Sequence, residues 1–223
     1  MNVKRLLILS TLLTVALAVA AIAAGLSLPP DLQLPMHWNA AGEVDRHAGK
    51  WTALLMPIGL AVAGTLLALV VTRTEPNRDA VKSSAGLIGI VWIGMVGLAW
   101  VIELMEFAVA FHWPIHPVRI VIGALGLFFV AMGNQFGKSR PMYLVGIRTP
   151  WTLADPDVWI ATHRLGGKLF VAAGAIWFGC ALSGVQGKAM PAVLLAIMLT
   201  AAFVPVFWSY VLWRRRGRPQ RGL

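Results

Sequence analysis

The sequence is poor in cysteine and in charge. Its single cysteine, Cys180, lies within a long apolar segment, so it cannot form an internal disulfide and says nothing about the redox compartment. Charged residues make up only 13% of the 223 residues, whereas ordinary soluble domains contain about a quarter. This scarcity excludes an ordinary soluble domain.

Long apolar runs dominate the chain instead. Apolar residues make up 58% of it, and its mean hydropathy is +0.75. A helix needs about 20 residues to cross a hydrocarbon core. Six stretches reach or approach that length: about 6–26, 52–71, 87–111, 118–132, 169–184 and 190–213. The pattern predicts an all-α polytopic membrane protein with membrane regions at 1–110 and 111–213 and a basic tail at 214–223.

The first apolar run has two interpretations. Lys4 and Arg5 precede it and Ala-rich positions near Ala23 follow, as in a cleaved signal peptide. The run is longer than a typical signal core, so we expect an uncleaved anchor.

Lys and Arg residues lie between and after the apolar runs. All but four of the 19 fall on one side of the predicted membrane, and the four exceptions are Arg46, Lys50, Arg119 and Lys188. Because basic residues mark the cytoplasmic side, both termini are predicted to be cytoplasmic. The formal charge of +10 could suggest nucleic-acid binding. The charges do not gather on one binding face, however, so we expect no direct contact with nucleic acid.

A polar loop at 27–51 is predicted on the outer side, where prolines prevent the first helix from continuing. One interpretation is an ordered hairpin that packs on the helix ends. The other is a ligand or metal site, since several side chains have suitable donor atoms, although no tight ligand spacing is present. The candidate residues of this loop are His37, Trp38, Asn39, Glu43, Asp45 and His47.

A second polar loop, at 133–168, is predicted on the cytoplasmic side. It contains "GIRTPWTLADPDVWIATHRLGGK", which is rich in Arg, Trp and Asp. Asp155 is the predicted N-cap of a helix, Pro156 its first residue, and Asp157 a second carboxylate near the positive end of the helix dipole. We expect this helix to continue into the fifth span.

The cytoplasmic loop is also the candidate binding surface. We place Arg148 at its centre, because a guanidinium fork can hold a carboxylate, a phosphate or several carbonyl groups. Trp151 and Trp159 are expected to form the walls of this site, whereas the basic tail is expected to be dispensable, so that Arg216→Gln is neutral. The candidate residues are Asn134, Lys138, Arg140, Arg148, Thr149, Trp151, Trp159, His163 and Arg164.

Two other roles for this loop remain open. Its Arg and Trp side chains could anchor the protein at lipid headgroups. His163 could act as a general base. No Ser, Cys or paired carboxylate is placed to act with His163, so we expect recognition rather than catalysis, without a cofactor.

The two loops together resemble a known family. "GNQFGKSRPMYLVGIRTPWTLADPDVWIATHRLGGK" closely resembles the signature of the Sdp immunity protein (SdpI-like) family of bacterial membrane proteins. "LPMHWNAAGEVDRHAGKW" resembles the extracytoplasmic domain of unknown function that precedes it in longer members, although "DRHAGK" departs from the usual pattern. The matching positions are Asn134, Gly146, Arg148, Thr149, Pro150, Trp159 and the run Thr162 to Lys168.

The resemblance implies a location in the bacterial cytoplasmic membrane and a function in immunity. Its best-known member protects the cell against a membrane-lytic toxin peptide and tethers a small DNA-binding repressor at the membrane. The lipid bilayer, a toxin peptide and a cytoplasmic repressor are therefore the expected partners. The oligomeric state stays open.

Ionisable residues within the third and fourth apolar runs support alternatives. Glu103 and Glu106 lie one helical turn apart, and Glu103 would serve a proton-coupled or ion-coupled transporter. We expect Glu106 to form an ion pair with Arg119. A further alternative is a metal-dependent lipid enzyme in which His112 and His116 join Glu106, although Pro114 interrupts that spacing.

Overall fold

The computed structural model describes residues 2–39, 43–184 and 189–216. Six of its helices are long and apolar enough to cross a membrane, which confirms the predicted all-α architecture. They are α1 (Val3–Ser27), α2 (Lys50–Thr74), α4 (Ala85–Ala110), α5 (Pro117–Phe136), α7 (Pro156–Ser183) and α8 (Met190–Arg215). Lys188 and the tail beyond Arg216 lie outside the described residues.

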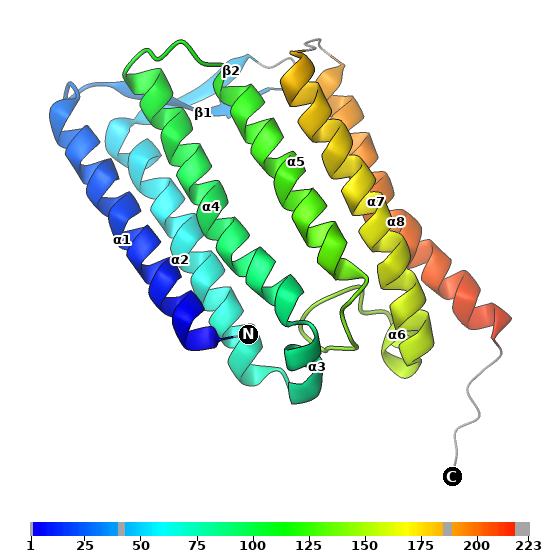
Figure 1. Ribbon diagram of the computed structural model, residues 1–223. Coiled ribbons are helices and arrows are strands. Elements are labelled where there is room, and N and C mark those ends of the chain that lie inside the picture. Colours follow the sequence, from blue (N-terminus) through cyan, green and yellow to red (C-terminus); the bar gives the residue numbers. More distant parts are fainter. Residues whose placement is uncertain (1, 40–42, 185–188, 217–223) are drawn as a thin grey trace.

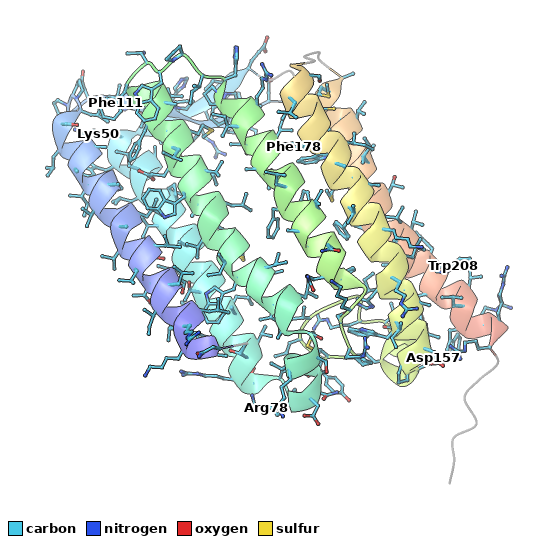
Figure 2. The ribbon with its side chains drawn as sticks, in the orientation of Figure 1. Lys50, Arg78, Phe111, Asp157, Phe178 and Trp208 are labelled. Atoms are coloured by element: carbon cyan, nitrogen blue, oxygen red, sulfur yellow. The ribbon has the colours of Figure 1, made fainter. Side chains whose placement is uncertain are left out.

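The six helices stand side by side as one bundle (Figure 1). A two-stranded hairpin covers one end, here called the hairpin side, and the start of α1 and the end of α8 lie at the other, the termini side. Lys50 and Phe111 mark the hairpin side in Figure 2, whereas Arg78 and Asp157 mark the termini side. That the termini side is cytoplasmic stays a prediction from the charge distribution.

The spans expose apolar side chains around the bundle. Leu12 is 62% exposed, Leu66 56% and Phe207 73%. An apolar surface of this extent is unfavourable in water and is expected where helices face acyl chains. The exposed apolar side chains of the spans are therefore expected to contact the acyl chains of a lipid bilayer.

The outer loop forms the expected hairpin. Strands β1 (Gln33–Trp38) and β2 (Val44–Gly49) pair in antiparallel fashion, with an irregular register between Pro35 and His37. Leu34 is buried in a cluster with Ala21 of α1 and Leu54 of α2. The hairpin is thus packed on the ends of the helices through its apolar side chains.

Helices α5 and α7 approach each other through glycine. A Cβ atom on Gly133 would lie 2.7 Å from the carbonyl oxygen of Gly167, and one on Gly126 would lie 2.7 Å from that of Gly174. Small residues let two membrane helices approach closely enough for backbone contact. This close pair holds the start of α7 beside the end of α5, where the cytoplasmic-loop candidates lie.

Two short helices complete the termini side. Helix α3 (Arg78–Ser83) joins α2 to α4, and α6 (Pro150–Ala154) precedes α7. The side chain of Asp155 accepts hydrogen bonds from the backbone N–H groups of Asp157 and Val158, so it caps α7 as predicted. As also expected, α7 continues into the fifth span.

Candidate functional site

The loop at 137–149, which joins α5 to α6, is anchored by a buried carboxylate that the sequence analysis missed. Glu75, directly after α2, has no exposed surface. Its carboxylate accepts hydrogen bonds from the backbone N–H groups of Tyr143 at 3.1 Å, Leu144 at 2.9 Å and Asn77 at 3.2 Å. In the sequence Glu75 is one acidic residue in a basic loop, a pattern more typical of a solvated side chain.

Further contacts fix the same loop against α2, α3 and α4. The backbone N–H of Arg140 donates to Ser84 Oγ at 3.0 Å, and the side-chain amide of Asn77 donates to the carbonyl of Pro141 at 3.2 Å. Met142 is fully buried in an apolar cluster with Val71. The loop therefore joins the α5–α7 pair to the first half of the bundle.

Trp159 and His163 form the second anchor. Both are fully buried, and their rings stack with centroids 4.0 Å apart and planes inclined by 16°. Nε2 of His163 accepts the backbone N–H of Ile147 at 2.9 Å. The ring proton therefore lies on Nδ1, which donates to the Trp159 carbonyl at 2.8 Å.

This geometry corrects two expectations. His163 is not placed as a general base, because both ring nitrogens are engaged and no solvent reaches them. Trp159 is not a wall of a surface site, because its indole is buried and its Nε1 donates to Ser139 Oγ at 3.3 Å. The packing of the helices buries the face of α7 that carries Trp159 and His163, and the spacing of residues along one helix does not predict which face is buried.

Gly146 is required by the same cluster. Its φ is +116°, and a Cβ atom there would lie 2.6 Å from the Trp159 ring and 2.7 Å from His163 Nε2. A residue with a side chain would meet both backbone strain and a collision at this position.

Trp151 lies apart from Trp159 and belongs to a contact with α8. Its Nε1 donates to Ser209 Oγ at 2.6 Å, and its ring packs against Tyr210 and Trp213. Thr149 caps α6 in a reciprocal arrangement with the buried Thr152. Trp151 and Thr149 thus make structural contacts, and Trp159, which is fully buried, does not form the expected wall beside Arg148.

What the loop exposes is positive charge. Arg148 donates to the carbonyl of Tyr143 at 2.5 Å, and Arg140 donates to those of Lys138 and Ser139, each at 3.2 Å. The backbone of Arg164 lies against Gly137, beside Lys138. We call the four exposed cationic side chains the basic loop face: Lys138, Arg140, Arg148 and Arg164. Asn134 is also exposed, at the end of α5.

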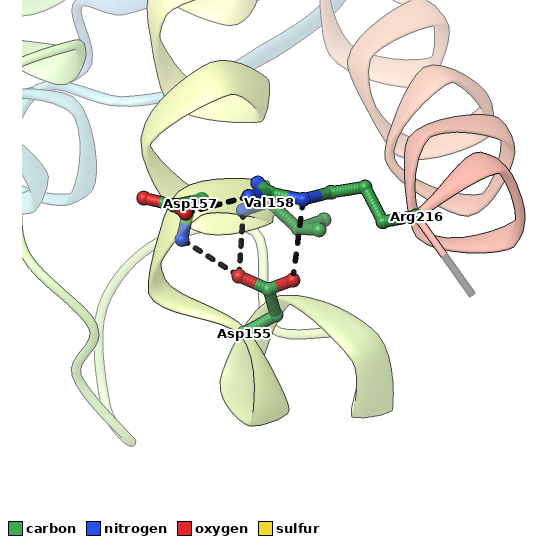
Figure 3. Close-up of polar contacts among 4 residues, drawn as sticks. All are labelled: Asp155, Asp157, Val158 and Arg216. Atoms are coloured by element: carbon green, nitrogen blue, oxygen red, sulfur yellow. Dashed lines mark hydrogen bonds and ion pairs between the residues drawn. The ribbon is translucent and has the colours of Figure 1, made fainter. Parts of the chain in front are cut away.

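Arg216 is part of the structure rather than a neutral residue of the tail. Its Nη2 lies 2.6 Å from Asp157 Oδ2, and its Nε lies 3.8 Å from Asp155 Oδ2 (Figure 3). The hydrogen bond to Asp157 raises the pKa of the guanidinium above its ordinary value. These contacts tie the end of α8 to the start of α7, so Arg216→Gln is unsuitable as a neutral control.

The hairpin residues pair with one another. Nδ1 of His37 lies 2.6 Å from Asp45 Oδ1, and the amide of Asn39 donates to Glu43 at 3.1 Å. Trp38 is half-buried and His47 is exposed.

The metal-site interpretations are not supported. In the part of the chain that the structure describes, no three His, Cys, Asp or Glu residues gather to hold a metal ion. This applies to the outer loop and equally to Glu106, His112 and His116. Both histidines lie in the exposed loop after α4.

The expected ion pair between Glu106 and Arg119 is wrong. Arg119 Nε donates to the carbonyl of Ala181 at 2.9 Å, and its Nη2 donates to that of Leu182 at 3.1 Å. The last carbonyls of a helix have no partner within the helix and attract such donors. Within the described residues no ion pair joins Arg119 to Glu106, which faces the other half of the bundle.

Comparison with known proteins agrees with this architecture. Residues 138–209 match the SdpI/YfhL protein family, and residues 12–61 match a domain of unknown function (DUF1648). The chain is also 22% identical over 185 residues to the immunity protein SdpI of Bacillus subtilis, covering 82% of this chain and 84% of that protein. No solved structure matches the chain.

The first match spans every cytoplasmic-loop candidate except Asn134, together with α7 and most of α8. The second spans most of α1, the hairpin and the first half of α2. The full-length similarity and the six spans fit a multi-pass protein of the bacterial cytoplasmic (inner) membrane. Residues 138–209 thus resemble the SdpI/YfhL family and residues 12–61 resemble the domain of unknown function, and most of the chain is similar to an immunity protein of the bacterial membrane.

Proposed function

We propose that this membrane protein protects its cell against a membrane-active toxin peptide and that the basic loop face binds a small cytoplasmic repressor protein. The similarity to an immunity protein supports the first part. The second part is supported by one observation: a loop backbone held by buried anchors presents three exposed cations beside the exposed Arg164 of α7, on the termini side.

Rigidity is what distinguishes this loop from a solvated charge run. Glu75 and His163 hold its backbone from two directions through buried hydrogen bonds. A partner that binds a preformed surface loses less conformational entropy than one that must order a flexible loop. The loop is therefore suited to recognition.

Charge indicates the chemistry of the partner surface. Three of the four cations are arginines, whose planar guanidinium groups bind carboxylates in a bidentate way. The described contact of Arg148 to Tyr143 uses one of five donors in its guanidinium. An acidic patch on the repressor is the complementary surface.

The experiment separates protection from partner binding. Cells expressing wild type, Arg148→Lys or Arg5→Lys are challenged with a membrane-active toxin peptide, and membrane recruitment of a labelled candidate repressor is followed in parallel. Arg5 is an exposed arginine on the same side of the protein and serves as the matched control. We expect Arg148→Lys to reduce recruitment at least tenfold, since loss of a charge-assisted bidentate contact is worth about 1.5–3 kcal/mol.

The two halves of the proposal can fail independently. If Arg148→Lys lowers survival but leaves recruitment normal, the basic loop face does not bind the repressor. If Arg148→Lys and a variant in which all four cations are replaced by Gln both behave like wild type in both assays, the loop serves only as a membrane anchor.

A further inference from the structure

Two glutamates of α4 are buried inside the membrane bundle. Glu103 is fully buried and Glu106 is 2% exposed. Both carboxylate oxygens of Glu103 and Oε2 of Glu106 are buried without a hydrogen-bond partner among the described residues. Buried polar groups are normally hydrogen-bonded, so two such side chains on one helix require an explanation.

The two side chains point to the same place. Val96, Ala99, Glu103, Glu106 and Ala110 follow one another along α4 at steps of three or four residues, which places them on one helix face. Val96 and Ala99 pack with α1 and α2, and Ala110 packs with the next apolar cluster of the same two helices. The carboxyl groups therefore enter the α1–α2–α4 interior between two apolar clusters.

No neighbouring charge neutralises them. The charged and titratable side chains that α1, α2, α5 and β1 bring toward α4 lie at helix ends or on the hairpin: Lys4, Arg5, Lys50, Arg73, Arg119 and His37. Those of α3 lie at the termini side, far from this end of α4. Lys50, the buried lysine, donates to the Leu28 carbonyl at 2.5 Å, and Arg119 is engaged by α7. Within the described residues neither glutamate takes part in an ion pair.

We propose that Glu103 and Glu106 form a proton-binding site within the α1–α2–α4 bundle. An isolated carboxylate in an apolar interior is very unfavourable, whereas a carboxylic acid is neutral. Binding of one proton removes the charge of a carboxylate, so each of the two buried side chains is stabilised by taking up a proton. A metal ion needs more oxygen ligands than two glutamates supply, and no third acidic side chain joins them among the described residues.

The site lies within reach of the hairpin side. Glu106 is four residues from Ala110, the last residue of α4, or roughly 6 Å at 1.5 Å per residue. Glu103 lies almost one further turn inside. Glu106 is thus the nearer of the two carboxyl groups to the hairpin side. This proposal rests on geometry and does not depend on the proposed immunity function.

Infrared spectroscopy of the purified protein tests the proposal. At neutral pH the wild type should show the C=O stretch of a protonated carboxyl group, and labelling of glutamate with ¹³C should shift it. The band should be lost in Glu103→Gln/Glu106→Gln and unchanged in Glu43→Gln, which alters an exposed hairpin carboxylate. Absence of the band in wild type, or its persistence in the double variant, would overturn the proposal.

A second measurement separates protons from metal cations and needs only wild-type protein. The melting temperature in detergent is compared in sodium and choline chloride at equal ionic strength. We expect no difference. A higher melting temperature in sodium chloride than in choline chloride would indicate that the site binds sodium rather than a proton.

Discussion

The carboxylate of Glu75 accepts the backbone N–H of Leu144 at 2.9 Å, across 69 residues of sequence. This contact fastens the cytoplasmic-loop candidates of the second half of the chain to the end of α2 in the first half. Because Glu75 is fully buried, its loss would leave backbone donors without an acceptor, a loss that water cannot replace.

Glu75→Gln should therefore destabilise the protein by about 1–3 kcal/mol, because the amide replaces one acceptor oxygen by a donor. Melting in detergent measures this effect, and limited proteolysis should show faster cleavage between Lys138 and Arg148. Asp79→Asn is the matched control, since that carboxylate is exposed and pairs with Lys82 at the surface. Equal melting of Glu75→Gln and Asp79→Asn would contradict the anchoring role.

Gly146→Ala should destabilise the protein by about 1–3 kcal/mol, because the backbone at φ +116° is strained for any residue with a Cβ atom. The collision with Trp159 and His163 adds to this cost. Gly97→Ala, where the added Cβ atom meets open space in α4, should be neutral or stabilising by up to about 1 kcal/mol. Tryptophan fluorescence during denaturation measures both, and the reverse order of stability would refute the assignment.

Arg119→Gln and Glu106→Gln should act independently. Arg119 bonds to carbonyl groups of α7 and Glu106 lies in the other half of the bundle, so the two share no partner. The change in unfolding free energy of the double variant should equal the sum of the single changes within about 0.3–0.5 kcal/mol. A coupling energy above about 1 kcal/mol would show that the two side chains interact, which would contradict the structure.

Asp155→Ala should destabilise the protein by about 1 kcal/mol, because the N-cap of α7 loses its acceptor. Arg216→Gln should have a smaller effect, since the carboxylate of Asp155 keeps its hydrogen bonds to the first turn of α7. Hydrogen exchange at Val158 should rise in both variants, and more in Asp155→Ala. The opposite ranking would show that the end of α8, rather than the cap, holds the start of α7.

Cysteine labelling tests the orientation of the protein. In a Cys180→Ala background, Lys138→Cys and His47→Cys place thiols at two exposed positions on opposite sides of the bundle. An impermeant reagent applied to intact cells should label position 47 and not position 138. Labelling at 138 alone would invert the topology and remove the basic loop face from the cytoplasm.

The sequence by itself determined those features that depend on local pattern. Six apolar runs of spanning length predicted six helices because the bilayer forces the backbone to satisfy its hydrogen bonds within each span. Asp155 followed by Pro156 predicted the start of α7, because cap and first-turn geometry involve only neighbouring residues. The prolines of 27–51 predicted a break after α1, and the hairpin stands there. The sidedness of the protein and the role of Arg148 stay predictions.

Only the tertiary structure decided which polar residues face inward. Trp159 and His163 look like surface residues in the sequence, yet the close α5–α7 contact and the loop with Gly146 enclose them. Arg119 was expected to pair with Glu106, but the packing of α5 on α7 places its side chain against carbonyl groups of α7 instead. Glu75 gained its role from donors almost 70 residues away. Such contacts depend on how helices pack across the whole chain, which periodicity within a single segment does not encode.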